Sequence, residues 1–184
     1  MSLRIFDLDP TLRPCEGQIW DRVKGYRYWK GELEKNEGGM EKFAEGYRIF
    51  GFNRVDKGYV YREWLPNAKQ AFLIGEFNKW ENTTPLKPEG FGRWAVQLPD
   101  KADGSTLLPH KSQLKVRIES NDGQWFERVP AWTKLAWQDA GTMLFNGVFW
   151  EPPAAERYVF RHARPPKPES LKIYEAHVGM GSCE

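Results

Sequence analysis

The sequence is poor in cysteine and has no long apolar run. Its 2 cysteines, Cys15 and Cys183, lie near opposite ends of the 184 residues, so they form neither a CxxC pair nor a disulfide framework, and a reducing compartment is expected. No apolar stretch approaches the roughly 20 residues that a membrane helix needs. Neither a secretory signal nor a transit peptide is recognisable at the start, which reads MSLRIFDLDP and contains early acidic residues. These absences predict a cytosolic protein with no membrane partner.

Catalytic motifs and a bias of charge are also missing. The three histidines, His110, His162 and His177, lie far apart and have no metal-binding spacing. There is no GxSxG motif, and Glu175 has no recognisable second carboxylate of the kind that a glycosidase needs. The formal net charge of +2 comes from both signs mixed along the chain, which argues against a nucleic-acid partner. We therefore expect no catalytic residue, no metal and no cofactor in these 184 residues.

Aromatic residues, in contrast, are abundant. They make up 15% of the sequence and include 9 Trp. Because Trp is rarely buried completely, we expect several of these rings at the surface. Hexose rings have apolar C–H faces that stack on flat aromatic rings, and their hydroxyls bind amide and charged groups. The composition therefore favours a carbohydrate-binding protein that uses several exposed rings at once.

Residues 1–52 are expected to form a helical segment. Apolar residues three or four positions apart predict two short helices, one with Ile19, Val23, Tyr26, Trp29 and Leu33 and one with Met40, Phe43, Tyr47 and Phe50. The stretch from Asn36 to Gly39 would end the first helix, because Gly-Gly terminates helices easily, and Gly51 would end the second. Two short helices cannot form a core alone, so they should pack on the residues C-terminal to them.

Residues 53–150 change to the alternation of β-strands. Six strands are predicted, at Tyr59–Trp64, Gln70–Gly75, Arg93–Leu98, Leu114–Glu119, Gln124–Val129 and Phe145–Trp150. Turn residues separate them, for example Asn121, Asp122 and Gly123. Short strands with tight turns favour a mainly β protein built as an antiparallel β-sandwich.

Two further segments complete the chain. Residues 151–169 are rich in proline and are expected to form an extended linker. Residues 170–184 contain LKIYEAHVG, which predicts a new strand without a partner. This end of the sequence is therefore interpreted as the start of a domain that is cut off.

Each aromatic ring also has a structural alternative to ligand binding. Trp94 is in phase with Val96 and Leu98, which favours the core, whereas Phe91 lies between two glycines and should be exposed. For Trp64, Trp80 and Trp125, the sequence is compatible with a place in the core and with a place in a ligand site. The simplest interpretation of Lys115 and Arg117 is the solvated face of a strand, and that of Asn36 and Glu37 is a helix end.

Four stretches resemble 1,4-alpha-glucan (glycogen or starch) branching enzymes of the eukaryotic type. They are NEGGMEKFAEGYRIFGF at 36–52, YREWLPNAKQAFLIGEFNKW at 61–80, LPHKSQLKVRI at 108–118 and RHARPPKPESLKIYEAHVGM at 161–180. The resemblance implies a helical segment, an immunoglobulin-like β-sandwich module of carbohydrate-binding family forty-eight, and the first strand of a catalytic (β/α)8 barrel at 170–184. The nucleophile Asp and acid/base Glu of that barrel would lie downstream.

The resemblance also implies an activity and partners. The complete protein would cut an α-1,4-glucan through a covalent glucosyl-enzyme intermediate and transfer the chain to a 6-hydroxyl with retention of configuration. Its partners would be α-1,4-glucan polymers (glycogen, starch or malto-oligosaccharides) and the catalytic barrel of the same protein. The module would hold the donor or acceptor glucan near that barrel.

Similar enzymes bind malto-oligosaccharide where the helices meet the module. The matching positions are Asn36, Glu37, Trp64, Leu65, Pro66, Gly90, Phe91, Gly92 and Arg93. Relatives often have Tyr in place of Phe91 and Lys in place of Arg93, so this chain keeps the stacking face but lacks the phenolic hydrogen bond. Kinase β-subunit modules of the same type imply a second glucan surface at Trp80, Lys115 and Trp125.

Three alternatives remain open on the sequence alone. A stand-alone regulatory glucan-binding module would not need the strand predicted after residue 170, and a debranching enzyme would lack the helix that contains NEGG. A generic sandwich domain without a sugar ligand would bind no malto-oligosaccharide.

Overall fold

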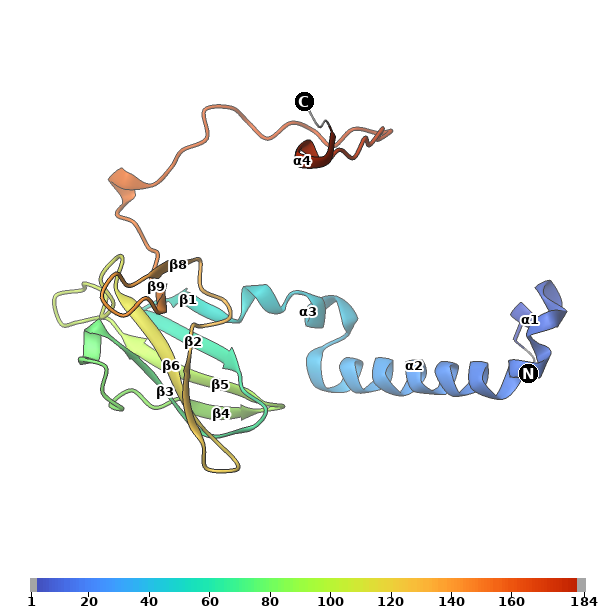
Figure 1. Cartoon of the computed structure of the whole chain (residues 1–184), viewed down its shortest axis with the longest axis horizontal. Coiled ribbons are helices and arrows are strands. Elements are labelled where there is room, and N and C mark those ends of the chain that lie inside the picture. Colours follow the sequence, from blue (N-terminus) through green and yellow to red (C-terminus); the bar gives the residue numbers. More distant parts are fainter. Residues whose placement is uncertain (1–2, 182–184) are drawn as a thin grey trace. The chain divides into compact units, whose positions relative to one another are not determined.

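The computed structural model describes residues 3–181 and divides into two units, Met1–Glu151 and Pro152–Glu184. Among the described residues, all strands and the long helix belong to the first unit (Figure 1). The pockets discussed below are lined by residues of the same unit. Cys183 lies outside the described residues.

The first unit begins with a helical segment. Two short elements, α1 (Ile5–Leu8) and the 3-10 helix η1 (Pro10–Cys15), precede the 22-residue helix α2 (Glu16–Glu37). Helix α2 ends because Gly38 adopts the left-handed conformation at φ 76° and donates its N–H to the carbonyl of Leu33. The first predicted helix is confirmed and is longer than expected. The second is divided into a short α-helix at Met40–Ala44 and a 3-10 helix at Gly46–Arg48, and Phe50 lies outside both. Among residues 3–181, no helix has the length and apolar character required to cross a membrane.

The helical region ends slightly earlier than predicted. After α2 come α3 (Met40–Ala44) and the 3-10 helix η2 (Gly46–Arg48). Strand β1 (Gly51–Val55) then begins inside the range 1–52 that was expected to be helical. Gly51 has a φ of 71°, and the backbone of Trp132 lies so close that a Cβ at Gly51 would be 3.1 Å from its carbonyl oxygen. A glycine is therefore required where the chain turns into the first strand.

Two antiparallel sheets form the sandwich that the sequence predicts (Figure 1). The first sheet has the order β1-β2-β5-β4, with β2 at Gly58–Trp64, β5 at Arg93–Pro99 and β4 at Lys87–Gly90. The second sheet has the order β3-β6-β9-β8, with β3 at Ala68–Gly75, β6 at Gln113–Ser120, β9 at Phe145–Val148 and β8 at Leu135–Gln138. Strand β7 (Trp125–Arg128) also pairs with β6.

The core lies where inward-facing side chains of both sheets meet. Tyr61 and Trp94 come from the first sheet, and Leu73, Leu114 and Val116 come from the second. The alternation predicted for β6 therefore turns its apolar side chains inward. Trp94 is 9% exposed, so its assignment to the core is confirmed.

All six predicted strands are present, and three further strands were missed. The missed strands are β1, β4 and β8. Every residue of β4 is exposed, so it lacks the alternation on which the prediction depended.

The second unit contains little regular structure. Among its described residues, the regular elements are the 3-10 helix η4 (Ala154–Glu156) and the short helix α4 (Val178–Gly181). The strand predicted for LKIYEAHVG at 171–179 is not formed in the described part of the chain, and Ile173 and Tyr174 are 84% and 92% exposed. A strand needs a neighbour for its backbone N–H and C=O groups, and no described segment pairs with this one.

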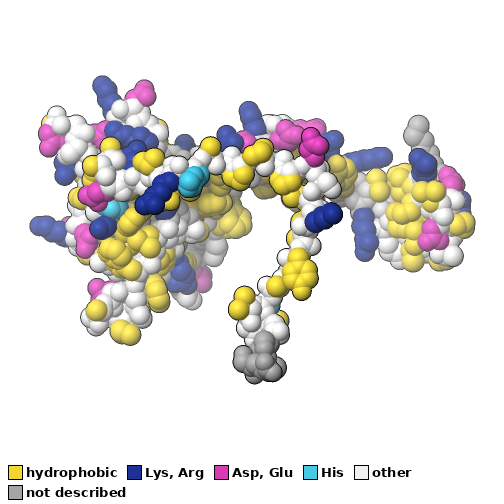
Figure 2. Space-filling view, turned by 90° about the horizontal axis from the view of Figure 1, so that it is seen from above, with side chains coloured by type: hydrophobic (Ala, Val, Ile, Leu, Met, Phe, Trp, Pro, Cys, Tyr) yellow, Lys and Arg dark blue, Asp and Glu magenta, His cyan; other side chains and the backbone are white. Residues whose placement is uncertain are grey.

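Charged residues of both signs are interspersed on the surface. In the face shown in Figure 2, Lys and Arg side chains alternate with Asp and Glu side chains, and hydrophobic side chains reach the surface between them. This agrees with the mixed charge pattern of the sequence.

Candidate functional site

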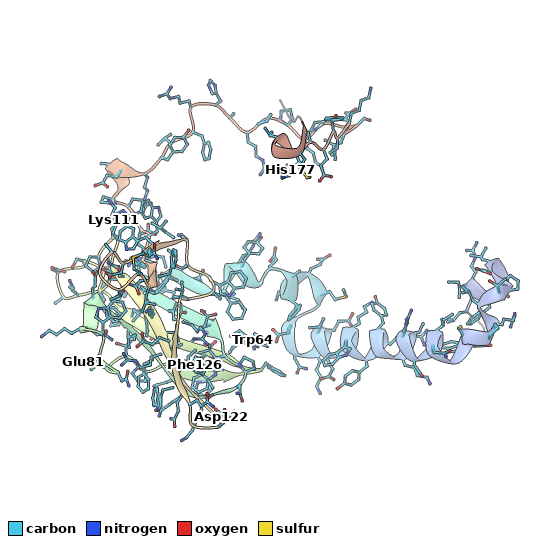
Figure 3. All side chains as sticks on the ribbon, viewed as in Figure 1. Trp64, Glu81, Lys111, Asp122, Phe126 and His177 are labelled. Carbon is cyan, nitrogen blue, oxygen red and sulfur yellow. The ribbon has the colours of Figure 1, made fainter. Side chains whose placement is uncertain are left out.

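A pocket of about 430 Å³ lies between the helical segment and the edge of the sandwich. We call it the helix–strand pocket, and it is lined by Trp29, Glu32, Leu33, Asn36, Glu37, Lys42, Phe43, Gly46, Ile49, Phe50, Trp64, Phe91 and Arg93. Figure 3 shows Trp64 at the side of the sandwich that faces the C-terminal end of α2. The structure thus brings together five of the predicted site residues, namely Asn36, Glu37, Trp64, Phe91 and Arg93.

One face of α2 forms the helical wall. Trp29, Leu33, Asn36 and Glu37 follow one another at intervals of four, three and one, which places them on the same side of a helix. Asn36 is exposed, and its Nδ2 donates a hydrogen bond to the Glu32 carboxylate at 3.2 Å. Its Oδ1 has no hydrogen-bond partner among residues 3–181, so this oxygen can accept from a ligand.

The opposite wall carries two exposed rings from neighbouring segments. Trp64 ends β2 and is 58% exposed, and Phe91 follows β4 and is 66% exposed. The exposure predicted for Phe91 is therefore confirmed. The indole Nε1 of Trp64 donates to the carbonyl oxygen of Phe91 at 3.1 Å, which fixes the orientation of the indole relative to the hairpin.

The turn between β4 and β5 positions Phe91. Gly90, Phe91 and Gly92 all have positive φ values, at 93°, 52° and 75°. A Cβ at Gly92 would lie 2.9 Å from both the Trp64 Nε1 and the Pro66 Cα, so the close approach of these segments requires glycine. Gly90 has open space around it. The two glycines thus shape the turn, and neither lines the pocket.

Leu65 and Pro66 support the wall without lining the pocket. The N–H of Leu65 donates to the carbonyl of Gly92 at 2.7 Å, and the carbonyl of Leu65 accepts from the Trp94 indole at 3.0 Å. These bonds fasten the segment after β2 to the β4–β5 turn. Their role in the structure is to hold Trp64 and Phe91 side by side.

An ion pair joins the two walls. Arg93 Nη1 lies 2.8 Å from Glu37 Oε2, and the two side chains are 22% and 18% exposed. The Arg93 guanidinium also lies 5.9 Å from the centre of the Phe91 ring. Its Nε is buried and has no hydrogen-bond partner in the described part of the chain. The two charged residues predicted to contact glucan thus contact each other.

The sequence pattern did not predict that the carboxylate next to Trp64, that of Glu63, is buried. Glu63 is 4% exposed and accepts hydrogen bonds from the Tyr61 hydroxyl at 2.7 Å, the Ala131 N–H at 2.9 Å and the Trp64 N–H at 3.2 Å. Burial, together with the nearby Glu63 carboxylate, raises the pKa of Tyr61 well above its usual range. Glu63 therefore anchors the backbone of Trp64 to the loop after β7.

Other lining residues were missed as well. The sequence assigns Trp29 and Leu33 only to a helix face, although their spacing to Asn36 and Glu37 is a signal that could have placed them in the pocket. No sequence pattern connects Phe50 with the sandwich. Its ring stacks on Trp132 with 5.4 Å between centroids and 8° between planes.

The second predicted surface is on the outer face of the other sheet. Trp125 pairs with Glu119 across β7 and β6, so Trp125 and Lys115 share one face of that sheet. Trp125 is 48% exposed and stacks on Phe72 at 6.3 Å. The Lys115 side chain is only 12% exposed and forms an ion pair with Glu127 at 3.5 Å.

The strand face around Lys115 is thus less solvated than the sequence suggested. Arg117 binds Glu127 at 2.7 Å and Asn82 at 2.9 Å. Trp80 is partly buried in the loop after β3. Its φ is 63°, and its backbone N–H donates a hydrogen bond to the carbonyl of Gly75. Within residues 3–181, no three His, Cys, Asp or Glu side chains come close enough to hold a metal ion.

Comparison with known proteins shows what this chain is similar to. Residues 49–133 match Carbohydrate-binding module 48 (Isoamylase N-terminal domain). The chain is 45% identical over its full length to 1,4-alpha-glucan-branching enzyme 1, chloroplastic/amyloplastic, of Pisum sativum, and 45% identical over 97% of its length to 1,4-alpha-glucan-branching enzyme of Emericella nidulans.

Among solved structures, pullulanase type I from Bacillus subtilis str. 168 complexed with maltose is 24% identical, with a TM-score of 0.45 over 66% of this chain and 15% of that one. The chain spans 22% of the pea relative and 26% of the Emericella relative. The chain thus contains a family-48 carbohydrate-binding module and is similar along its whole length to the region of 1,4-alpha-glucan-branching enzymes that it matches.

Proposed function

We propose that the helix–strand pocket binds a short segment of an α-1,4-glucan chain. One observation carries this proposal: the exposed rings of Trp64 and Phe91 border the same pocket as the polar side chains of Asn36 and Glu37. The rings offer flat apolar surfaces to the C–H faces of glucose, and the amide and carboxylate offer partners to its hydroxyls.

The expected affinity is modest. Burying about 100 Å² of apolar surface on one ring contributes about 2.5 kcal/mol before the cost of association. Two rings with hydrogen-bonding neighbours therefore give weak binding of a single oligosaccharide. A polymer with many equivalent segments compensates for this, because several sites can engage one chain.

In the full-length protein, this region holds donor or acceptor glucan for a catalytic domain. Residues 53–150 form the glucan-binding module, 151–169 the linker and 170–184 the beginning of the catalytic barrel. That barrel cuts an α-1,4 linkage through a covalent glucosyl-enzyme intermediate and transfers the chain to a 6-hydroxyl with retention. The support for this assignment is the 45% identity to enzymes named 1,4-alpha-glucan-branching enzyme. The 184 residues alone should bind glucan without transferring it.

The outer face of the second sheet is a second candidate surface for the same polymer. Trp125 offers an exposed ring that Phe72 supports from one side, and Lys115 lies on the same face. Trp80, in the loop after β3, completes the set that the resemblance implies.

The proposed location of the full-length protein is the cytosol. Fluorescence microscopy of the tagged protein in its source cells tests this, and accumulation in plastids, as the name of the pea relative states for that enzyme, would contradict it.

Titration of the 184-residue protein with maltoheptaose tests the binding proposal. Isothermal calorimetry should give saturable binding, and Trp64→Ala should weaken it at least about fivefold, since removal of a central ring at an interface commonly costs that much. Trp20→Ala is the matched control, because Trp20 is a tryptophan of α2 that does not line the pocket. Absence of saturable binding, or equal affinities of wild type and Trp64→Ala, would contradict the proposal.

A further inference from the structure

A second pocket with aromatic walls lies next to the helix–strand pocket. It has a volume of about 280 Å³ and is formed where η2 and β1 meet the loop after β7 and the end of β9. We call it the corner pocket. Phe50 lines both pockets, and it stacks on Trp132, which lines the corner pocket.

Three exposed rings surround the corner pocket. Tyr47 is 59% exposed, Trp132 is 42% exposed and Trp150 is 38% exposed. Two of them are held in place, Trp132 by its stacking on Phe50 and Trp150 by an edge contact with His110 at 4.6 Å. Large exposed rings that neighbouring groups orient are preorganised for stacking, because little side-chain entropy remains to be lost on binding.

Polar side chains also line the corner pocket. The lining includes Asn53, Thr133 and Lys134. The Lys134 ammonium makes no ion pair among the described residues, so its three N–H groups can donate to a ligand. The remaining charged lining residue is Glu151, so the pocket contains one charge of each sign. A neutral ligand with many hydroxyls suits this lining better than an ion does.

The geometry points to the corner pocket as a further α-glucan subsite, which binds a short segment of the polymer between Tyr47, Trp132 and Trp150 with hydrogen bonds to Lys134 and Asn53. This inference rests on the proposed glucan binding, since it assigns the same class of ligand to a neighbouring pocket. Because Phe50 borders both pockets, two segments of one polymer or of two branches can occupy them together, and binding of the polymer then gains from the high effective concentration at the second site.

The test uses the side-chain N–H signals of the tryptophans in the NMR spectrum of the 184-residue protein, titrated with maltotriose. The variants Trp64→Phe and Trp150→Phe assign the two informative signals. Trp64 reports on the helix–strand pocket and Trp150 on the corner pocket. Both signals should shift with saturation. In the double variant Tyr47→Ala, Lys134→Ala, the midpoint of the Trp150 shift should rise at least about fivefold, while that of Trp64 changes little.

The matched control is Tyr26→Ala, because Tyr26 is 58% exposed and lines neither pocket. It should leave both midpoints unchanged. A saturable Trp64 shift with a stationary Trp150 signal would overturn the corner subsite and leave the proposed function intact. A Trp150 midpoint that the double variant does not alter would also overturn it. If neither signal moves, the corner subsite and the proposed function both fail, and if Trp150 alone moves, the subsite stands while the assignment of the helix–strand pocket fails.

Discussion

Arg93, the first residue of β5, forms an ion pair with Glu37, the last residue of α2, with 2.8 Å between Nη1 and Oε2. No residue of α2 is buried, so the helix has little apolar packing to hold it against the sandwich. Because most of the stability of protein helices comes from the packing of an apolar face, this 22-residue helix depends on its other contacts for its position. The ion pair therefore has a positional role: it fixes the end of the helix that lines the helix–strand pocket.

Replacement of Arg93 tests this role. Arg93→Ala leaves the Glu37 carboxylate, only 18% exposed, without its partner, so the free energy of unfolding should fall by about 1–2 kcal/mol. The affinity for maltoheptaose should fall as well, because the walls are no longer joined. Arg93→Lys should keep most of the stability and most of the affinity for maltoheptaose, because a single Arg93 nitrogen contacts Glu37. Urea unfolding and calorimetry measure the two effects.

The control for this experiment is Arg48→Ala. It breaks the pair between Arg48 and Glu45, whose side chains are 63% and 47% exposed, and it should change stability little because water screens exposed pairs. The positional role would be refuted if Arg93→Ala bound maltoheptaose as tightly as wild type.

Replacement of Phe91 should weaken glucan binding without lowering the stability of the protein. Its ring is 66% exposed, so Phe91→Ala should change the free energy of unfolding by less than about 0.5 kcal/mol. Calorimetry should nevertheless show maltoheptaose affinity at least about fivefold weaker, since the stacking face is lost. Phe91→Tyr keeps the face and adds a hydroxyl, so its affinity should equal or exceed that of wild type.

Phe145→Ala serves as the reference for Phe91→Ala. Phe145 is 56% exposed at the start of β9 and does not line the helix–strand pocket, so its removal should not affect sugar binding. Equal losses of affinity in the two variants would argue against a specific role of Phe91.

Much of the sandwich could be predicted because its strands follow simple rules. The alternation in β6 places Leu114, Val116 and Ile118 inside, and Trp94 is in phase with Leu98. Strand β4 was missed because Lys87–Gly90 is exposed throughout and its strand character comes from pairing with β5. The alternation of apolar and polar residues predicts which side chains are buried. It does not predict an exposed strand that forms because it pairs with a neighbouring strand.

The site was predictable only in part, for the same reason. The glycines on both sides of Phe91 indicated an exposed ring, whereas the local pattern left Trp64 open between the core and a ligand site. The partnership of Glu37 with Arg93 spans 56 residues, and no periodicity reports such a contact. Trp132 and Trp150 follow strands in irregular segments, so only the folded chain brings them to the corner pocket.

Tyr61 should make stability depend on pH in the alkaline range. Its pKa in the folded protein is raised by burial and by the Glu63 carboxylate, whereas in the unfolded chain it should be about 10. The folded state therefore holds the proton more tightly, and the stabilisation is complete below about pH 10 and is lost as the pH rises further. Urea unfolding between about pH 8 and 11 should show a decline of up to about 1.4 kcal/mol per pH unit from this group.

Tyr61→Phe isolates this contribution. The variant loses the hydrogen bond to Glu63 and should be less stable at neutral pH, but its stability should decline less steeply above about pH 10. Tyr26→Phe, which changes an exposed ring of α2, should keep the slope of wild type. A Tyr61→Phe profile parallel to that of wild type would show that another group causes the alkaline loss.

Gly92 and Gly90 allow backbone strain to be distinguished from a steric clash. Both have positive φ values, so alanine at either position should cost about 1 kcal/mol or more. At Gly92 the new Cβ would also lie 2.9 Å from the Trp64 Nε1 and the Pro66 Cα, whereas Gly90 has nothing within 4 Å. Gly92→Ala should therefore be the less stable variant in urea unfolding. It should also displace the Trp64 indole from the Phe91 carbonyl and weaken maltoheptaose binding, while Gly90→Ala binds nearly as wild type. Equal behaviour of the two variants would mean that the turn accommodates the Cβ without moving Trp64.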